Sequence, residues 1–246
     1  MIQISDLHLG ASWPTGDPAR ALARAVDAVN AFPATPAAIL VTGDLTDVAT
    51  AANYERAREE LSRLQAPILA LPGNHDGREP MRRCFDLPGE GDESIQYAVD
   101  LDPFRVLALD TVDPGSDAGS LDGGRLSWLA AELARAPERP TLIAMHHPPL
   151  LTTVRVWDEI ALAAADREAL ERIVAANPQV LGLVAGHLHR TVFSDLAGRP
   201  VLAIPSVYEQ AKLDFALTDF EMSSDPPAFA VHTLVDGRLV SHIQPF

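Results

Sequence analysis

Six short apolar runs constrain the fold of this chain more than any other feature of its sequence. They are rich in Val, Ile and Leu and do not alternate with polar residues, which is typical of strands buried within a sheet. The runs are Met1–Ile4, Ala38–Val41, Ile68–Leu71, Val106–Leu109, Leu142–Met145 and Val180–Val184. Amphipathic stretches separate them, so the pattern predicts an α/β fold.

Four stretches with a helical spacing of apolar residues accompany these strands. The first begins at Asp17 and Pro18, residue types that suit the cap and the first position of a helix. The other expected helices are Ala51–Leu64, Leu126–Ala134 and Arg167–Ala176. The Pro-, Gly- and Asp-rich stretches Leu87–Glu93 and Asp113–Gly124 are expected to be surface loops at the rim of a cleft.

The last quarter of the chain has a different character, with turn residues between short strand-like segments. The strands expected there are Thr191–Leu196, Val201–Ile204, Asp214–Glu221, Phe229–Leu234 and Leu239–Ile243. No linker or internal repeat is evident in the sequence. We therefore expect one domain over residues 1–246, with a motif-bearing α/β part up to about residue 190 and a β-rich part from there to the end.

Composition argues against some classes of function. The net charge of -15 repels a nucleic acid backbone, and no stripe of Lys and Arg offsets it, so we expect no nucleic acid polymer as a partner. No apolar run reaches the ~18 residues that span a bilayer, so we expect no membrane insertion. The single cysteine, Cys84, is expected to be an ordinary half-buried residue and fits a reducing compartment. With no signal peptide before the first motif, these features predict a cytoplasmic protein.

Five groups of polar residues each follow one of the apolar runs directly. They are Asp6 and His8, Asp44 and Asp47, Asn74 to Asp76, His146 and His147, and His187 and His189. Ligands of open α/β sheets bind outside the carboxyl ends of the strands, so we expect these groups to share one crevice. The remaining histidines, His232 and His242, are expected to be partly buried strand residues.

The residue types in these groups indicate a metal site. Carboxylates, imidazoles and one amide oxygen suit Mn, Fe, Zn or Co, and contain too much nitrogen for Ca or Mg alone. Seven candidate ligands exceed the four that one tetrahedral zinc ion needs, and they match two metals if one carboxylate bridges. Each motif alone is common, since Gly-Asn and Gly-Asp also form turns. All five in this order, each after an apolar run, favour a site over a structural explanation.

The motifs resemble those of the calcineurin-like metallophosphoesterases. That family pattern is Asp-x-His, Gly-Asp, Gly-Asn-His, His and Gly-His-x-His, and this chain has every element in order between Asp6 and His189. The tail, with Pro205-Ser206 and Gln210, resembles the class III cyclic nucleotide phosphodiesterases and the related bacterial glycerophosphodiesterases. The resemblance implies a four-layer αββα sandwich, in which two mixed β-sheets are flanked by helices.

The resemblance also implies roles for individual residues. One metal would be held by Asp6, His8 and His189, the other by Asn74, His146 and His187, and Asp44 would bridge the two. His75 would be the catalytic histidine that assists the leaving oxygen, and Asp76 would orient it from behind. Whether His147 and Arg78 contact phosphate or support the site is left open by the sequence.

Differences between this sequence and the motifs of serine/threonine phosphatases narrow the class of substrate. The Gly-Asp motif lacks the arginine that follows it in serine/threonine phosphatases, and Asp76 stands where those enzymes have Glu. We therefore expect a small phosphodiester as substrate, with a 3′,5′-cyclic nucleotide first and a glycerophosphodiester or another small diester as the alternative. The motifs also allow a metal-free scaffold of the same fold, or a hydrolase with a single metal ion.

The walls of the site are less well specified. Trp157, Phe85 and Tyr208 are available as an apolar wall for a nucleobase, although each suits the core equally well. Val154–Ile160 resembles the segment that caps the pocket in the family. Several relatives are dimers or larger, so a homodimer or higher homo-oligomer is also expected, with an edge of the β-rich part as its contact.

Overall fold

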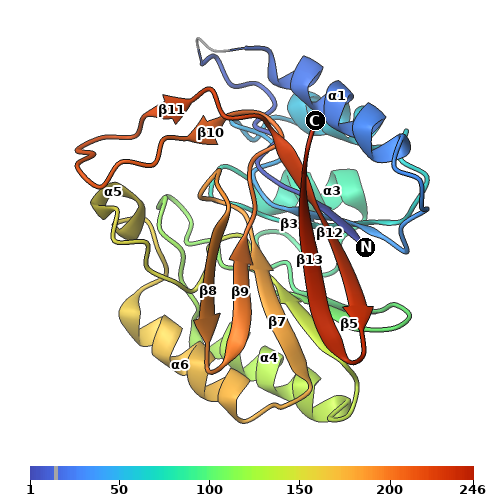
Figure 1. The fold of residues 1–246 in the computed structure, drawn as a ribbon, viewed down its shortest axis with the longest axis vertical. Helices are drawn as coiled ribbons and strands as arrows, with labels where there is room; N and C mark the ends of the chain where they lie inside the picture. The colour runs from blue at the N-terminus through green and yellow to red at the C-terminus, as the bar shows by residue number, and fades with distance from the viewer. Residues whose placement is uncertain (14–15) are drawn as a thin grey trace.

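Two β-sheets packed face to face form the centre of the computed structural model, which describes residues 1–13 and 16–246 (Figure 1). The first sheet contains, in spatial order, β13 (Arg238–Pro245), β12 (Ala228–Val235), β1 (Ile2–Ile4), β2 (Ile39–Thr42) and β3 (Ile68–Leu71). The second contains β4 (Tyr97–Asp100), β5 (Arg105–Ala108), β6 (Thr141–Ala144), β7 (Val180–Ala185), β9 (Arg199–Ala203) and β8 (Val192–Leu196). Strands β1 to β3 are parallel to one another, as are β5, β6, β7 and β9, whereas β12, β13, β4 and β8 pair in an antiparallel manner.

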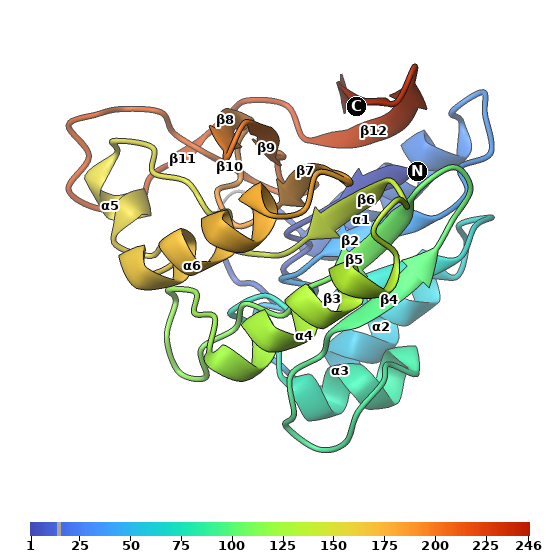
Figure 2. The same cartoon turned by 90° about the horizontal axis from the view of Figure 1, so that it is seen from below.

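Helices cover the outer face of each sheet, as Figure 2 shows. The helices are α1 (Pro18–Asn30), α2 (Ala51–Leu61), α3 (Arg78–Phe85), α4 (Gly123–Arg135), α5 (Arg155–Asp158) and α6 (Ala164–Ala175). Ile39 and Val41 of β2 pack toward α1 and α2, whereas Leu40 between them faces the second sheet. In the same way Leu107 of β5 packs toward α4 and α6, and Val106 faces the first sheet. The expected αββα sandwich is confirmed, because strand residues alternate between an inner and an outer core.

Most of the predicted elements are present, and two helices begin where the sequence indicates. The side chain of Asp17 accepts a hydrogen bond from Ala19 N with Pro18 at the first helical position, as expected for α1. At the start of α2, Thr50 accepts from Asn53 N. No helix in the part of the chain that the structure describes is long and apolar enough to cross a membrane.

One predicted strand is wrong. Residues 214–221 form a loop between the two-residue strands β10 (Gln210–Ala211) and β11 (Met222–Ser223), which pair with each other. We call residues 210–223 the β10–β11 arm. The alternation in the loop suggested a strand, but Phe215 and Phe220 are 68% and 42% exposed, because no sheet lies beneath them. The arm extends beside α5, where Arg155 Nη2 donates a hydrogen bond to Thr218 O (Figure 1).

A buried polar chain links the two sheets at His232. His232 is fully buried, with Nε2 at 2.9 Å from Gln3 Oε1 and Nδ1 at 2.8 Å from Ser241 Oγ. The side-chain amide of Gln3 donates in turn to Thr42 Oγ1 and, across the sandwich, to Ala185 O of β7. Burial, together with the nearby N-terminal amino group, lowers the pKa of His232 to about 3.

This histidine should make the stability of the fold depend on pH. Its folded pKa of about 3 lies below the unfolded value near 6.5, so the unfolded chain binds the extra proton between those two pH values. We expect the free energy of unfolding of metal-free protein to fall by about 1.4 kcal/mol per pH unit from this group as pH drops below 6. In denaturant titrations His232→Gln should lose that slope, while the exposed control His242→Gln should keep it. Equal slopes in wild type and His232→Gln would contradict the assignment.

Candidate metal centre

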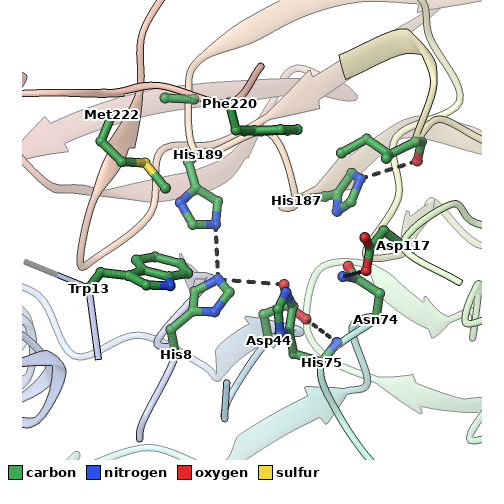
Figure 3. Close-up of a pocket in the computed structure, with 12 residues that line it drawn as sticks. His8, Trp13, Asp44, Asn74, His75, Asp117, His187, His189, Phe220 and Met222 are labelled. Carbon is green, nitrogen blue, oxygen red and sulfur yellow. Dashed lines mark hydrogen bonds and ion pairs between the residues drawn. The ribbon is translucent and has the colours of Figure 1, made fainter. Parts of the chain in front are cut away.

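The five predicted groups of polar residues meet at one end of the sandwich. Those after β1, β2 and β3 come from the first sheet, and those after β6 and β7 come from the second. The seven candidate ligands are Asp6, His8, Asp44, Asn74, His146, His187 and His189, and six of them are buried. Figure 3 shows five of the seven lining a pocket. The expectation of one shared crevice is therefore confirmed by the strand order.

Five of the seven candidate ligands have a backbone that non-glycine residues rarely adopt. They are Asp6, His8, Asp44, His187 and His189, with φ angles of 58°, 47°, 50°, 71° and 46°. Such residues cost about 1–3 kcal/mol each and persist when neighbours fix them. The neighbours here are the loops themselves, since His8 N donates to Asp44 O and His187 N donates to both carboxylate oxygens of Asp6. This left-handed backbone turns successive side chains toward one point.

In the first half of the site, hydrogen bonds fix which ring nitrogens carry a proton. His189 Nδ1 lies 2.8 Å from the carbonyl oxygen of Glu209, and His8 Nδ1 lies 3.2 Å from Asp47 Oδ1. Both oxygens can only accept, so both Nδ1 atoms are protonated and Nε2 keeps its lone pair in the neutral ring. The two Nε2 atoms face each other at 3.0 Å, with Asp44 Oδ2 at 3.5 Å from His8 Nε2. Lone pairs that converge in this way need a cation between them.

In the second half of the site, a backbone carbonyl oxygen likewise holds one nitrogen of each histidine ring. His146 Nδ1 lies 2.7 Å from Thr42 O, and His187 Nε2 lies 3.2 Å from Ile160 O. The other two nitrogens, His146 Nε2 and His187 Nδ1, face each other at 3.2 Å. Asn74 Oδ1 at 3.0 Å and Asp44 Oδ2 at 3.3 Å from His146 Nε2 complete the group.

Each half of the site contains one histidine whose pKa is raised and one whose pKa is lowered. Burial opposes charge on His8, but the neighbouring carboxylates outweigh it and raise its pKa, whereas burial lowers the pKa of His189 to about 4. For His146 the carboxylate of Asp44 outweighs burial and raises the pKa to about 9, whereas burial holds the pKa of His187 well below its usual value. In each half, nearby carboxylates therefore favour positive charge on one ring, while burial disfavours it on the other.

These two groups of donor atoms indicate two metal ions. The ligand atoms of Asp6, His8, Asp44 and His189 lie within 4.8 Å of one another, and so do those of His146, His147 and His187. Asp44 lies close to a histidine nitrogen of each half. Imidazole with carboxylate oxygen suits first-row transition metals and zinc, so the donor set fits the expected chemistry.

The structure contradicts the role expected for Asp76. This carboxylate makes no hydrogen bond to His75; it accepts hydrogen bonds from Tyr54 Oη, from its own loop and from the loop after β2. Those other donors are Gly73 N, Leu45 N, Thr46 N and Thr46 Oγ1. Burial, reinforced by Asp44, raises the pKa of Asp76 to about 6. Asp76 thus ties the loop after β3 to the loop after β2, because backbone N–H groups of both loops point into its carboxylate.

Asp47 occupies the position beside His75 that was expected for Asp76. The carbonyl oxygen of Asp47 lies 3.2 Å from His75 Nδ1, and its Oδ1 lies 3.5 Å from the same atom. Its Oδ1 also holds His8, so Asp47 supports two histidines of the site at once. The sequence showed Asp47 in the motif Gly-Asp-Leu-Thr-Asp but offered no signal that separated its role from that of Asp76.

The structure shows the contacts of Arg78 and His147, whose roles the sequence left open. Arg78 donates to both carboxylate oxygens of the buried Asp110, at 2.7 and 3.1 Å, and to Val112 O. His147 is fully buried, with Nδ1 at 2.8 Å from Thr111 Oγ1 and Nε2 at 3.2 Å from the carbonyl oxygen of residue 117. Neither lines the pocket, and their hydrogen bonds hold the loops beside it; a ring nitrogen of His147 also lies within 4.8 Å of nitrogens of His146 and His187.

The pocket beside the candidate ligands has a volume of about 280 Å³ and a largely apolar wall. That wall consists of Trp13, Ile160, Ala211, Phe220 and Met222. The indole of Trp13 stacks on Tyr208 with ring centroids 5.6 Å apart. Figure 3 shows the indole beside the ring of His8, and the two ring centroids are 4.7 Å apart. Only the place of Trp13 a few residues after His8 could have suggested this role from sequence.

Two of the expected wall residues belong to the core instead. Trp157 is 1% exposed in the core under α4 and α6, and Phe85 packs against the core under α1 and α2. Within the expected cap Val154–Ile160, one residue, Ile160, lines the pocket. The β10–β11 arm supplies Ala211, Phe220 and Met222, so most of the described cap comes from the arm.

A two-sheet sandwich with two groups of histidine and carboxylate side chains at one end is the arrangement that the motifs predict for a metal-dependent phosphoesterase. A family model described as calcineurin-like phosphoesterase matches residues 1–191, and the chain belongs to that family. The motif-based expectation of a metal-dependent phosphoesterase is thereby confirmed.

Relatives and solved structures agree with this membership. The chain is 30% identical to the probable glycerophosphodiester phosphodiesterase GpdQ of Arcobacter nitrofigilis, over 94% of this chain and 87% of that protein. It is 32% identical to the 3′,5′-cyclic adenosine monophosphate phosphodiesterase CpdA of Pseudomonas aeruginosa, over 99% of this chain and 88% of that protein. The fold is similar to that of a dimetal phosphatase from Danio rerio, with a TM-score of 0.72, 17% identity and coverage of 99% and 95% of the two chains.

The environment of Arg78 leads to a prediction about stability. Removing this guanidinium takes away the two close charged hydrogen bonds to Asp110, whose side chain is 0% exposed, and leaves Arg125 Nη1 at 3.9 Å as its charged partner. We expect Arg78→Ala to lower the free energy of unfolding by about 3–5 kcal/mol. Arg83→Ala on the same helix removes an exposed pair with Glu79 and should cost less than about 1 kcal/mol. Chemical denaturation measures both; a stable Arg78→Ala protein with a raised KM would instead show a substrate contact.

Proposed function

We propose that this chain hydrolyses a small phosphodiester, and that the diester is a 3′,5′-cyclic nucleotide. The observation that supports this most is the position of an aromatic and apolar wall directly beside two groups of converging metal-ligand atoms. A phosphate held at the ligand atoms would place its organic substituent against Trp13, whose indole offers a stacking face for a base. The volume of about 280 Å³ suits a small molecule better than a polymer.

The proposed ligands follow from the two halves of the site. Asp6, His8 and His189 would hold one metal, Asn74, His146 and His187 would hold the other, and Asp44 would bridge them. Support comes from the distances, since Asp44 Oδ2 is 3.5 Å from His8 Nε2 and 3.3 Å from His146 Nε2. Hydrogen bonds from the far ring nitrogens fix the ring orientations, as is usual for histidines that bind metals.

We assign His75 to the leaving group. When bound, the two metal ions would supply Lewis-acid stabilisation of the phosphoryl oxygens and lower the pKa of an attacking water. His75 Nδ1 is held by the carbonyl oxygen of Asp47, so its other nitrogen is left to face the pocket. In its protonated form His75 would donate from Nε2 to the departing alkoxide. Asp47 would act through His75 as a positioning residue.

A second substrate class has its own support. Relatives named as glycerophosphodiester phosphodiesterases match this chain about as well as those named for cyclic nucleotides, at 30% and 32% identity. The ligand atoms would serve both reactions, because both cleave a phosphodiester. We place the cyclic nucleotide first because a glycerol group has no flat face to stack on Trp13.

The metals themselves stay a prediction, with Mn, Fe, Zn or Co as candidates, as do a cytoplasmic location and a homo-oligomeric state. A metal-free scaffold of the same fold would need no set of converging lone pairs. This chain retains the whole set, which favours an enzyme.

The proposed reaction is tested with two model esters. Protein freed of metal and then given Mn, Zn, Fe or Co should cleave bis(p-nitrophenyl) phosphate well and p-nitrophenyl phosphate poorly, and neither without metal. Cyclic AMP, cyclic GMP and glycerophosphoethanolamine then decide the substrate class by kcat/KM. No cleavage of any diester with any of the metals would refute the proposed activity.

The ligand assignment is tested separately at Asn74. Asn74→Ala removes the amide oxygen that lies 3.0 Å from His146 Nε2, so one metal should be held more weakly. We expect turnover to fall by roughly 100-fold and bound metal, measured by plasma emission, to fall from two ions toward one. Asn30→Ala, an exposed residue of α1, is the matched control and should keep both. Full activity in Asn74→Ala would rule out this assignment.

A further inference from the structure

Besides Asp44, the pocket is lined by a carboxylate that is not a candidate ligand, that of Asp117. Asp117 is exposed and lies beside Asn74, whose side-chain Nδ2 donates to Asp117 Oδ1 at 3.5 Å (Figure 3). Asn74 turns its other amide atom, Oδ1, toward His146. The Asp117 carboxylate is therefore one side chain away from the donor atoms on which a phosphate would be held.

The loop that carries Asp117 is fixed from beneath by His147. The ring nitrogen Nε2 of His147 donates to the carbonyl oxygen of Asp117 at 3.2 Å, and its Nδ1 accepts from Thr111 Oγ1 at 2.8 Å. Gly119 packs so closely that a Cβ atom there would lie 2.5 Å from the His147 ring. Ser120 N also donates to Thr111 O, which closes the loop. The carboxylate thus belongs to a built wall of the pocket.

The charges around the pocket make this position important. Among the described residues that line it, none is Lys or Arg, so any positive charge beyond the histidines would come from bound metal. Asp44 is buried among the candidate ligands, which leaves Asp117 as the lining carboxylate that faces an entering substrate. A phosphodiester carries one negative charge, whereas a monoester carries nearly two above its second pKa of about 6.

We propose that Asp117 selects diesters over monoesters by charge and that His147 positions it for this. The carboxylate repels every anionic substrate, but it repels a dianion about twice as strongly as a monoanion at the same place. Asp117 is then a specificity-determining residue of the pocket wall. This inference rests on the proposed diesterase function.

The experiment compares Asp117→Asn with wild type on two substrates. With Mn at pH 8 and low salt, kcat/KM is measured for p-nitrophenyl phosphate and for bis(p-nitrophenyl) phosphate. The monoester-to-diester ratio should rise about fivefold in Asp117→Asn, and the rise should shrink at high salt. Asp113→Asn, on the exposed part of the same loop, is the matched control and should keep the wild-type ratio.

Two further measurements separate charge from structure. At a pH below the second pKa of the monoester, where it is mostly a monoanion, the ratio in Asp117→Asn should return to that of wild type. In calorimetry, inorganic phosphate at pH 8 should bind Asp117→Asn about fivefold more tightly, whereas dimethyl phosphate should gain less. A purely structural change would alter both ligands alike.

Each contrary outcome has a distinct meaning. An unchanged ratio in an active Asp117→Asn enzyme would overturn the selectivity role and leave the diesterase proposal standing. A parallel loss of both activities together with bound metal would also overturn it, because Asp117 would then only support Asn74. If wild type cleaves no diester, the proposed function fails, and this inference fails with it.

Discussion

The carboxylate of Asp44 joins the two sheets. Its Oδ2 lies 3.5 Å from His8 Nε2, which follows β1 of the first sheet, and 3.3 Å from His146 Nε2, which follows β6 of the second. Its other oxygen accepts a hydrogen bond from His75 N. Two glycines permit this approach, since a Cβ at Gly73 would lie 2.2 Å from Asp44 Oδ1 and one at Gly43 would lie 2.5 Å from His146 Nδ1. The contacts of Asp44 therefore link the spacing of the two sheets to the geometry of the site.

Without cations, such a site destabilises the folded state. Carboxylates and lone pairs that face each other in a buried region lose hydration, and cations between them restore the balance. Burial lowers the pKa of His187 and His189, while nearby carboxylates outweigh burial and raise the pKa of His8 and His146, so each half has one ring on which positive charge is favoured. Because a metal would bind the folded site only, part of its binding free energy becomes stability of the fold. The same binding free energy would offset the cost of the left-handed backbone at five candidate ligands.

Sequence analysis could predict the features that depend on strand ends. A ligand that follows a buried strand by two to four residues has little freedom, so Asp6, Asp44 and His187 could be grouped before their geometry was known. It could not predict features set by loops. Asp47 and Asp76 lie in equally plausible motifs, and only the path of the loop after β3 places Asp76 among backbone N–H groups. The apolar alternation of residues 214–221 looked like a strand because sequence does not show whether a sheet lies beneath it.

The same division explains how one set of ligands can serve different substrates. Metal-ligand candidates come from the ends of strands, whereas the walls of the pocket come from four separate segments: the loop at Trp13, the loop at Asp117, the loop at Ile160 and the β10–β11 arm. Changes in these segments leave the strands and their ends in place, since none of them lies between the sheets. This division agrees with the different substrate names of two relatives that are each about 30% identical to this chain. These wall segments contribute an indole ring, a carboxylate and several apolar side chains to the pocket, and we expect substrate choice to depend on them.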